Sequence, residues 1–148
     1  MIALPLAAFA AVFAFGVPDV SALTFGGQQT DVETARFELC AGADERDNCI
    51  VDGDTFWYHG DKIRIADINA PEASNPQCHA EARLAARATG RLYDLLNDGP
   101  FTLEEIDRDK DRYGRLLRNV TRDGESLGTK LVRAGLAEEW RGYRRSWC

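Results

Sequence analysis

Residues 49–72, CIVDGDTFWYHGDKIRIADINAPE, decide the fold predicted for this chain. Its two halves are expected to pair as a hairpin, because residues 56–58 (FWY) are typical of a strand. Residues 62–66 (KIRIA) alternate polar and apolar side chains, which indicates a half-buried strand. Gly60 lies between the halves and supplies the positive φ that a tight hairpin needs. Pro71 ends the second half because it has no N–H to donate to a sheet.

Such a hairpin brings four polar side chains towards one of its ends: Asp54, Arg64, Asn69 and Glu72. A carboxylate near a guanidinium is common on protein surfaces, where such an ion pair contributes little to the stability of the fold. One interpretation is therefore a solvated hairpin with an exposed ion pair. The other interpretation is a functional site at that end.

Four elements follow one another in the chain: DGDT at residues 52–55, Arg64, the PE ending at 71–72 and DRYGR at 111–115. In order and approximate spacing they resemble the staphylococcal nuclease (thermonuclease) family, with matching elements from about residue 50 to residue 137. The resemblance implies an α+β fold, an OB-type five-stranded β-barrel with helices packed outside it, in which ligands bind one face of the barrel.

The N-terminus is apolar, with no charged residue in residues 1–17. That run is shorter than the roughly 20 residues that cross a bilayer. The small residues at 20–22 (VSA) predict signal-peptidase cleavage before Leu23. No Lys or Arg precedes Arg36, so the usual basic start of a signal peptide is missing and an uncleaved anchor is the alternative. The predicted division is a signal peptide at 1–22, a linker at 23–36 and the nuclease-like domain at 37–148.

The four cysteines agree with export, because an even number in a small exported domain favours disulfides. Four cysteines allow three connectivities. Cys40 and Cys49 bracket a polar loop, which predicts a local bridge and leaves Cys78 to pair with Cys148. Zinc is disfavoured because no CxxC pair is present and the chain has only two histidines. The predicted location is secreted or periplasmic, with no stable membrane association after the signal is removed.

Charge is unevenly distributed along a chain whose net charge is −6. Residues 31–61 hold nine acidic and two basic residues, whereas residues 62–148 hold sixteen basic and fourteen acidic ones. A protein that coats nucleic acid by electrostatics alone is broadly basic, so the net charge argues against a high-affinity coating protein. An enzyme that binds a few phosphates in a focused cationic cleft remains compatible with this balance.

A helix is predicted at residues 79–97, with Arg83, Arg87 and Arg91 along one face. That face is either solvated or a track for phosphates. Further elements are expected as strands at 101–106 and 116–120 and as a short helix capped by Ser126 that ends at Gly135. The basic and aromatic tail, residues 138–148, is expected to pack as a lid held by the disulfide of Cys148. Arg144 and Arg145 on this tail are within reach of a nucleic-acid backbone.

The resemblance also implies the chemistry. In the family pattern Arg64, Glu72 and Arg115 fall on catalytic positions, where the glutamate activates water and the two arginines clamp the phosphate. Tyr113, with Arg112 beside it, falls in the position of a substrate-binding residue.

The same pattern implies a calcium ion held by Asp54, Asn69 and the backbone carbonyl of Ala70. The family has an aspartate where this chain has Asn69, so the site loses one negative charge and calcium affinity should be weakened. Asp67 would share the face of Asn69 in a regular strand and is a candidate replacement.

Two hypotheses follow. The first is an exported, monomeric, metal-dependent nuclease that cleaves DNA and RNA. The second is a catalytically weak OB-type module that binds nucleic acid or a protein. The presence of Arg64, Glu72 and Arg115 favours the first, because a binding module has no need of a base between two phosphate clamps. Asn69 and the acidic balance favour the second.

Overall fold

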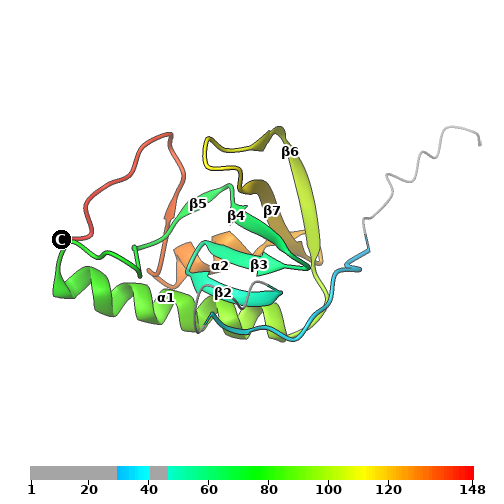
Figure 1. Cartoon of the computed structure of the whole chain (residues 1–148), viewed down its shortest axis with the longest axis horizontal. Coiled ribbons are helices and arrows are strands. Elements are labelled where there is room, and N and C mark those ends of the chain that lie inside the picture. Colours follow the sequence, from blue (N-terminus) through cyan, green and yellow to red (C-terminus); the bar gives the residue numbers. More distant parts are fainter. Residues whose placement is uncertain (1–29, 41–46) are drawn as a thin grey trace, which may run out of the picture.

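The computed structural model describes residues 30–40 and 47–148 (Figure 1). The predicted signal peptide lies outside the described residues. The chain is built mostly of strands with two helices, which confirms the α+β class. The elements in order are β1 (Glu38–Leu39), β2 (Asn48–Asp52), β3 (Thr55–Tyr58), β4 (Asp61–Ile65), β5 (Ile68–Asn69), α1 (His79–Asn97), β6 (Thr102–Lys110), β7 (Leu116–Arg122), β8 (Glu125–Ser126), α2 (Leu127–Arg133) and β9 (Glu138–Glu139).

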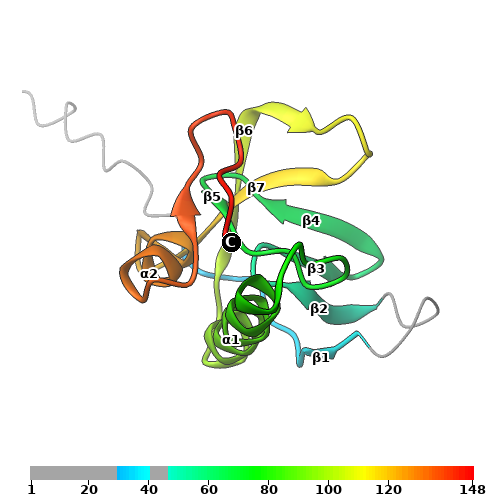
Figure 2. The same cartoon turned by 90° about the vertical axis from the view of Figure 1, so that its left-hand side faces the viewer.

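The main sheet has the order β1-β2-β3-β4-β7-β6, with β8 paired to β7, and β5 pairs with β9 in a separate ribbon. The helices α1 and α2 contact each other and lie to one side of the strands (Figure 2). Within the described residues no ladder joins β6 to β1 or β2, so the sheet is open and the predicted closed five-stranded barrel is not confirmed.

The predicted hairpin is confirmed as β3 and β4, which pair with Thr55 opposite Arg64. Its turn has positive φ at both central residues, 47° at His59 and 85° at Gly60, which is the geometry that matches the twist of a two-residue hairpin. Because the register is fixed in this way, Arg64 lies at the same end of the hairpin as the DGDT segment.

The core lies between the sheet and α1, and its largest fully buried side chains include Phe37, Phe56 and Phe101. The Phe37 ring meets those of Phe56 and Phe101 with centroids 5.7 and 6.1 Å apart. Residues expected to belong to the linker also contact this unit, since the backbone of Glu33 pairs with Phe101 and the Tyr58 hydroxyl donates to Glu33 at 2.6 Å.

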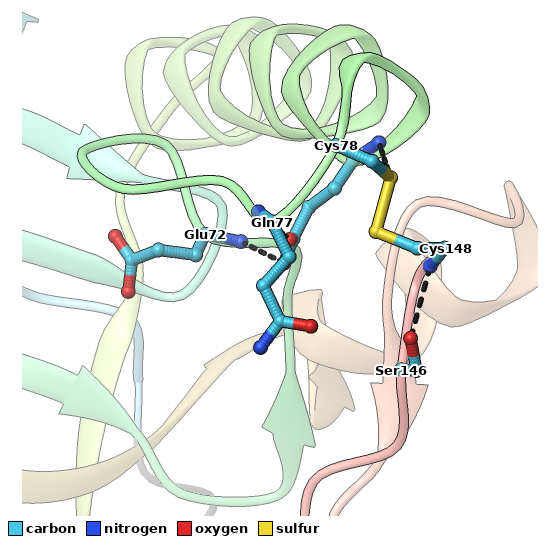
Figure 3. The surroundings of a disulfide bond; sticks show 6 residues. Glu72, Gln77, Cys78, Ser146 and Cys148 are labelled. Atoms are coloured by element: carbon cyan, nitrogen blue, oxygen red, sulfur yellow. Dashed lines mark hydrogen bonds between the residues drawn. A yellow bond between two sulfur atoms is a disulfide. The ribbon is translucent and has the colours of Figure 1, made fainter.

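Both predicted disulfides are present, Cys40–Cys49 and Cys78–Cys148. The second joins the last residue of the chain to the N-cap of α1 (Figure 3). Closing a loop of 70 residues stabilises the fold by roughly 4 kcal/mol in the chain-entropy account. Neither helix in the described part of the chain has the length and apolar character needed to cross a membrane.

Gly53 sets how closely the DGD turn approaches α1. A Cβ atom there would lie 2.6 Å from the Cβ of Ala88 and 2.9 Å from the Cβ of Ala70. Both neighbouring atoms are fixed to the backbone, so neither can move aside as the end of a flexible side chain would. Only glycine allows this contact between the hairpin, the helix and the segment after β5.

We expect Gly53→Ala to lower the free energy of unfolding by about 1–3 kcal/mol, the usual cost of overpacking. Gly90→Ala is the matched control, because Gly90 lies in α1 with open space around its Cα and alanine favours helix by roughly 1 kcal/mol. Thermal unfolding of both variants is the measurement. A Gly53→Ala protein that unfolds at or above the parent temperature would contradict the close contact.

Candidate active site

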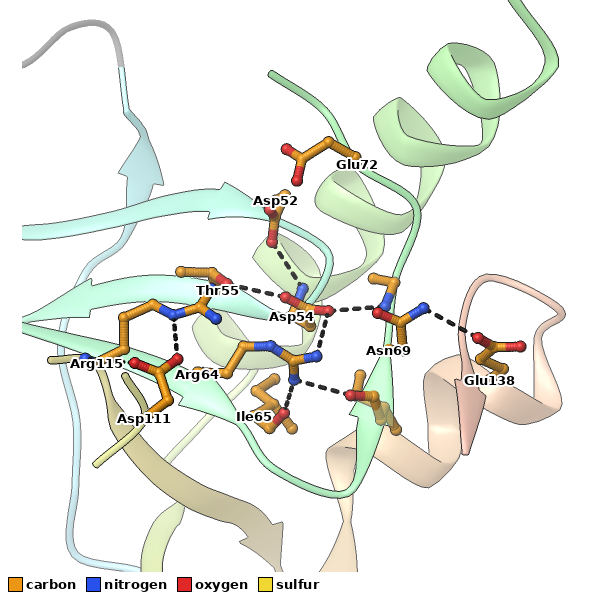
Figure 4. Close-up of polar contacts among 12 residues, drawn as sticks. Asp52, Asp54, Thr55, Arg64, Ile65, Asn69, Glu72, Asp111, Arg115 and Glu138 are labelled. Atoms are coloured by element: carbon orange, nitrogen blue, oxygen red, sulfur yellow. Dashed lines mark hydrogen bonds and ion pairs between the residues drawn. The ribbon is translucent and has the colours of Figure 1, made fainter. Parts of the chain in front are cut away.

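Asp54 and Arg64 form a buried ion pair at the end of the hairpin (Figure 4). Nη2 of Arg64 lies 3.2 Å from Oδ2 of Asp54, and both side chains are 7% exposed. Nη1 of Arg64 donates to the carbonyls of Ile65 and Ile68, the latter at 2.8 Å. Oδ2 of Asp54 also accepts from the N–H of Ala70 at 2.7 Å. The pair therefore fixes the chain from residue 65 to residue 70.

Of the two interpretations of the hairpin end, the solvated one with an exposed ion pair is wrong, because Arg64 and Asp54 are buried. Burial lowers the pKa of the Arg64 guanidinium, Asp54 opposes this, and the positive charges of Arg115 and Arg144 lower it further. Nε of Arg64 bonds to no acceptor among the described residues, so this edge of the guanidinium stays open to a ligand. A clamp built on Arg64 must use that edge.

Two further carboxylates, those of Asp52 and Glu72, lie near the pair. Asp52 and Asp54 are 9% and 5% exposed, and Oδ1 of Asp52 accepts from the N–H of Asp54 at 3.1 Å. The side chain of Glu72 points towards Asp52 (Figure 4). Burial raises the pKa of the Asp52 carboxyl to about 7, and the negative charges of Asp54 and Glu72 add to that rise. Ionising Asp52 beside Asp54 and Glu72 is therefore unfavourable, and a bound cation would stabilise the ionised carboxylates.

A groove of about 580 Å³ opens next to Arg64, and we call it the arginine groove. Two aromatic side chains, Tyr113 and Trp140, line it and are 68% and 42% exposed. The arginines that line it are Arg64, Arg108, Arg112, Arg115 and Arg144, and the lining holds one acidic residue, Asp111. Such a combination of guanidinium groups and exposed rings is suited to a phosphate backbone with unstacked bases.

Arg115 is held by Asp111 at the turn between β6 and β7. Nε of Arg115 donates to Oδ2 of Asp111 at 2.7 Å, while the backbone N–H groups of Arg115 and Tyr113 donate to Oδ1. Although burial opposes ionisation, these hydrogen bonds hold the pKa of the Asp111 carboxyl below its usual value. The two terminal nitrogens of Arg115 donate to no other group in the described part of the chain. Arg115 can therefore present a two-nitrogen fork to the groove.

Tyr113 and Arg112 extend this turn into solvent. Nη2 of Arg112 donates to the Tyr113 hydroxyl at 2.6 Å, and the guanidinium carbons of Arg112 and Arg115 lie 4.7 and 5.5 Å from the centroid of the ring. The predicted substrate-binding residues therefore line the same groove as Arg64 and Arg115.

Glu72 does not line the arginine groove. It lines a second cavity of about 260 Å³, together with Asn69, Ala70 and Arg144. Oε1 of Glu72 accepts from the N–H of Ser74 at 3.1 Å. The structure thus gathers the two predicted clamps in one groove and the predicted base in a neighbouring one, and Arg144 lines both.

Asn69 is 1% exposed and lies opposite Glu138 in the β5–β9 ribbon. Its Nδ2 donates to Oε1 of Glu138 at 3.0 Å, whereas its Oδ1 receives no hydrogen bond within the described residues. Arg145 donates to Glu138 from Nε at 2.7 Å and from its backbone N–H at 3.2 Å. Despite burial, these hydrogen bonds hold the pKa of the Glu138 carboxyl below its usual value. A carboxylate therefore faces the position where the family pattern has an aspartate.

Asp67 does not replace that charge. Its Oδ2 accepts from the hydroxyl of Ser126 at 2.5 Å, and its Oδ1 lies against Gly128 in α2. The expectation of a shared face with Asn69 is wrong. Strand β4 ends at Ile65 and β5 begins at Ile68, so Asp67 lies between the strands and not on one regular strand with Asn69.

Several residues of the site were not identified from the sequence: Asp52, Arg108, Glu138 and Trp140. Asp52 could have been identified from the sequence, since it is the first acid of the DGD segment. No sequence pattern identifies Trp140 and Glu138, because only the pairing of β9 with β5 brings them to the site. The tail is tethered, but it is not the packed lid expected, since residues 139–146 are exposed. Arg83, Arg87 and Arg91 are exposed on α1 and line neither cavity, which favours the solvated face.

Comparison with known proteins is consistent with this geometry. Residues 62–146 match the family described as Staphylococcal nuclease homologue. That range holds Arg64, Asn69, Glu72 and Arg115, and it begins after the DGD segment.

Two curated relatives from Bacillus subtilis (strain 168) are similar over 92 residues, or 59% of this chain. One, "SPbeta prophage-derived endonuclease YokF", is 38% identical and is covered over 31% of its length. The other, "Endonuclease YncB", is 36% identical and is covered over 43% of its length. The chain thus spans less than half of each relative. Since the family match extends over more than half of its residues, the chain belongs to the family of staphylococcal nuclease homologues.

Proposed function

We propose that this chain is an exported, metal-dependent nuclease that hydrolyses phosphodiester bonds in DNA and RNA as a monomer. The observation that carries the proposal is the buried Asp54–Arg64 pair, which joins a group of carboxylates to the arginine groove. Family membership and two relatives named as endonucleases support the reaction class. The two disulfides support an oxidising location, secreted or periplasmic.

In this proposal the phosphate backbone lies in the arginine groove. The Nε edge of Arg64 and the terminal fork of Arg115 donate to phosphate oxygens, and they stabilise the negative charge that builds up in the transition state. Tyr113 and Arg112 hold the neighbouring part of the strand. These groups are already oriented by Asp54 and Asp111, so little reorganisation is needed when substrate binds.

Glu72 acts as the general base. Its carboxylate takes a proton from a water molecule, whose oxygen attacks the phosphorus. The bond from phosphorus to the 5′ oxygen breaks, the departing oxygen takes up a proton from solvent, and the product keeps a 3′-phosphate. Because Glu72 and the two arginines line separate cavities that share only Arg144, this step requires the attacked phosphate to lie between the two cavities.

The residues on the carboxylate side fit a hard cation such as calcium. The Oδ1 of Asn69 is a buried oxygen that receives no hydrogen bond within the described residues, and burial, together with the negative charges of Asp54 and Glu72, raises the pKa of Asp52. In the described residues no three acidic, histidine or cysteine side chains converge on one metal position, so amide and carbonyl oxygens or water must complete the set. Asp54, Asn69 and the carbonyl of Ala70 are the proposed ligands. A bound calcium ion would add positive charge beside the phosphate.

One observation favours the alternative, a binding module with weak catalysis. Nη1 and Nη2 of Arg64 are already bonded within the protein, and Glu72 lines a different cavity from Arg115. Digestion of plasmid DNA and of RNA, with calcium, with magnesium and with chelator, separates the two. The proposal predicts cleavage of both substrates with calcium and none with chelator. Binding without cleavage under all three conditions would select the module.

We expect Arg115→Lys to lower the cleavage rate on the order of 10²–10³-fold at unchanged thermal stability, because an ammonium cannot supply the two-nitrogen fork. Arg64→Lys should lower both rate and stability, since lysine cannot bond Asp54 and two carbonyls at once. Arg133→Lys on α2, outside the arginine groove, is the control. Turnover within threefold of the parent for both groove variants would refute the two-clamp assignment.

We expect Asn69→Asp alone to destabilise the metal-free protein, because the new carboxylate would face Glu138 across the β5–β9 ribbon. Asn69→Asp with Glu138→Gln should recover the parent stability in chelator and lower the half-saturating calcium concentration about tenfold, which corresponds to 1.4 kcal/mol. The measurements are thermal unfolding and a calcium titration of the parent, both single variants and the double variant. Additive effects of the two changes would show that residues 69 and 138 are not coupled.

A further inference from the structure

The C-terminal segment, residues 140–148, borders the site and is anchored at its beginning, near its middle and at its end. The N–H of Trp140 donates to the carbonyl of Asp67 at 2.9 Å, and Cys148 is bonded to Cys78. Figure 3 shows Ser146 and Cys148 beside the loop that runs from Glu72 to Cys78. The segment is therefore tied to the loop that carries the proposed base.

The middle anchor is Arg145, whose side chain and backbone N–H both donate to the buried carboxylate of Glu138. This anchor fixes the backbone immediately after Arg144. The position of Arg144 beside the site is thus set by the fold, although its side chain is exposed.

Arg144 differs from the other arginines of the segment. Arg145 pairs with Glu138, and Arg141 lies 3.7 Å from the carboxylate of Glu139. Arg144 forms no hydrogen bond and no ion pair within the described residues. Its charge nevertheless acts on Arg64 and lowers the pKa of that guanidinium.

Among the described residues, Arg144 is the only arginine that lines both the arginine groove and the cavity of Glu72. It does so without a carboxylate partner in the described part of the chain. A cation held close to Arg64 without a counter-charge raises the energy of the free protein, and an anion at this junction lowers it. The anion must reach both cavities, as the backbone of a nucleic-acid strand does.

We propose that Arg144 is a substrate-binding residue that contacts a phosphate of the strand where it passes from the arginine groove to Glu72, and that the Cys78–Cys148 disulfide holds it there. The inference rests on the proposed nuclease function and adds to Arg64, Arg112 and Arg115 a fourth arginine, from a segment outside the DGDT, PE and DRYGR elements.

The test is binding of a fluorescein-labelled single-stranded oligonucleotide in the Glu72→Gln background, which keeps the strand intact. Arg144→Ala should weaken binding roughly tenfold or more, as expected for one charge-assisted contact. It should also reduce the slope of log affinity against log salt by about 0.7, the value for one phosphate contact on a single strand. Arg141→Ala is the matched control, since it removes the same charge from the same exposed segment and Arg141 does not line the groove.

The outcomes distinguish a wrong assignment of Arg144 from a wrong proposed function. If Arg144→Ala and Arg141→Ala behave alike, in affinity and in salt slope, the assignment of Arg144 is wrong even where the parent cleaves nucleic acid. If the parent neither binds nor cleaves the strand, the proposed function fails and the inference fails with it.

The tether is tested with Cys78→Ser combined with Cys148→Ser, in which serine at position 78 still caps α1. The pair of changes should weaken binding by a factor similar to that of Arg144→Ala, and adding Arg144→Ala should then change little. Effects that multiply would show that the disulfide does not act through Arg144. Circular dichroism establishes that each variant is folded.

Discussion

The Asp54–Arg64 pair is the interaction on which the rest of the site depends. An ion pair this deeply buried costs desolvation energy and is maintained only if its remaining hydrogen-bonding groups are satisfied. Here the carbonyls of Ile65 and Ile68 and the N–H of Ala70 satisfy them, apart from Nε of Arg64, which has no acceptor among the described residues. Because those three groups belong to one short segment, the pair holds β5 and the chain leading to Glu72 against the hairpin.

The same constraint explains which parts of the molecule could be predicted from sequence. The hairpin, α1 and the Cys40–Cys49 disulfide follow from local patterns: turn residues around Gly60, helical periodicity in residues 79–97 and cysteines that bracket a loop. The Cys78–Cys148 disulfide then follows because only those two cysteines are left. Burial of Arg64 could not be predicted, since it depends on the segment after β4 turning so that the carbonyl of Ile68 meets the guanidinium. The open edge of the sheet was also missed, because closure depends on contacts between strands distant in sequence.

The site residues divide in the same way. Arg115 and Tyr113 lie within a five-residue turn, so their common groove follows from local sequence. Glu138 and Trp140 reach the site only through the β5–β9 ribbon, and no spacing in the chain indicates this. Arg144 was expected within reach of a nucleic-acid backbone, but its place between the two cavities was not. Asn69 is understood only with its neighbour, since a second carboxylate at position 69 would face Glu138. The substitution at 69 and the acid at 138 thus form one electrostatic arrangement.

The most direct test of the account is single-turnover cleavage by Glu72→Gln at saturating calcium, compared with the parent. The substitution keeps the oxygen that accepts from Ser74 and removes only the capacity to take a proton. The account predicts a fall in rate on the order of 10²–10⁴-fold, with oligonucleotide affinity and unfolding temperature unchanged. A cleavage rate within threefold of the parent would contradict it, because Glu72 would then not be the base.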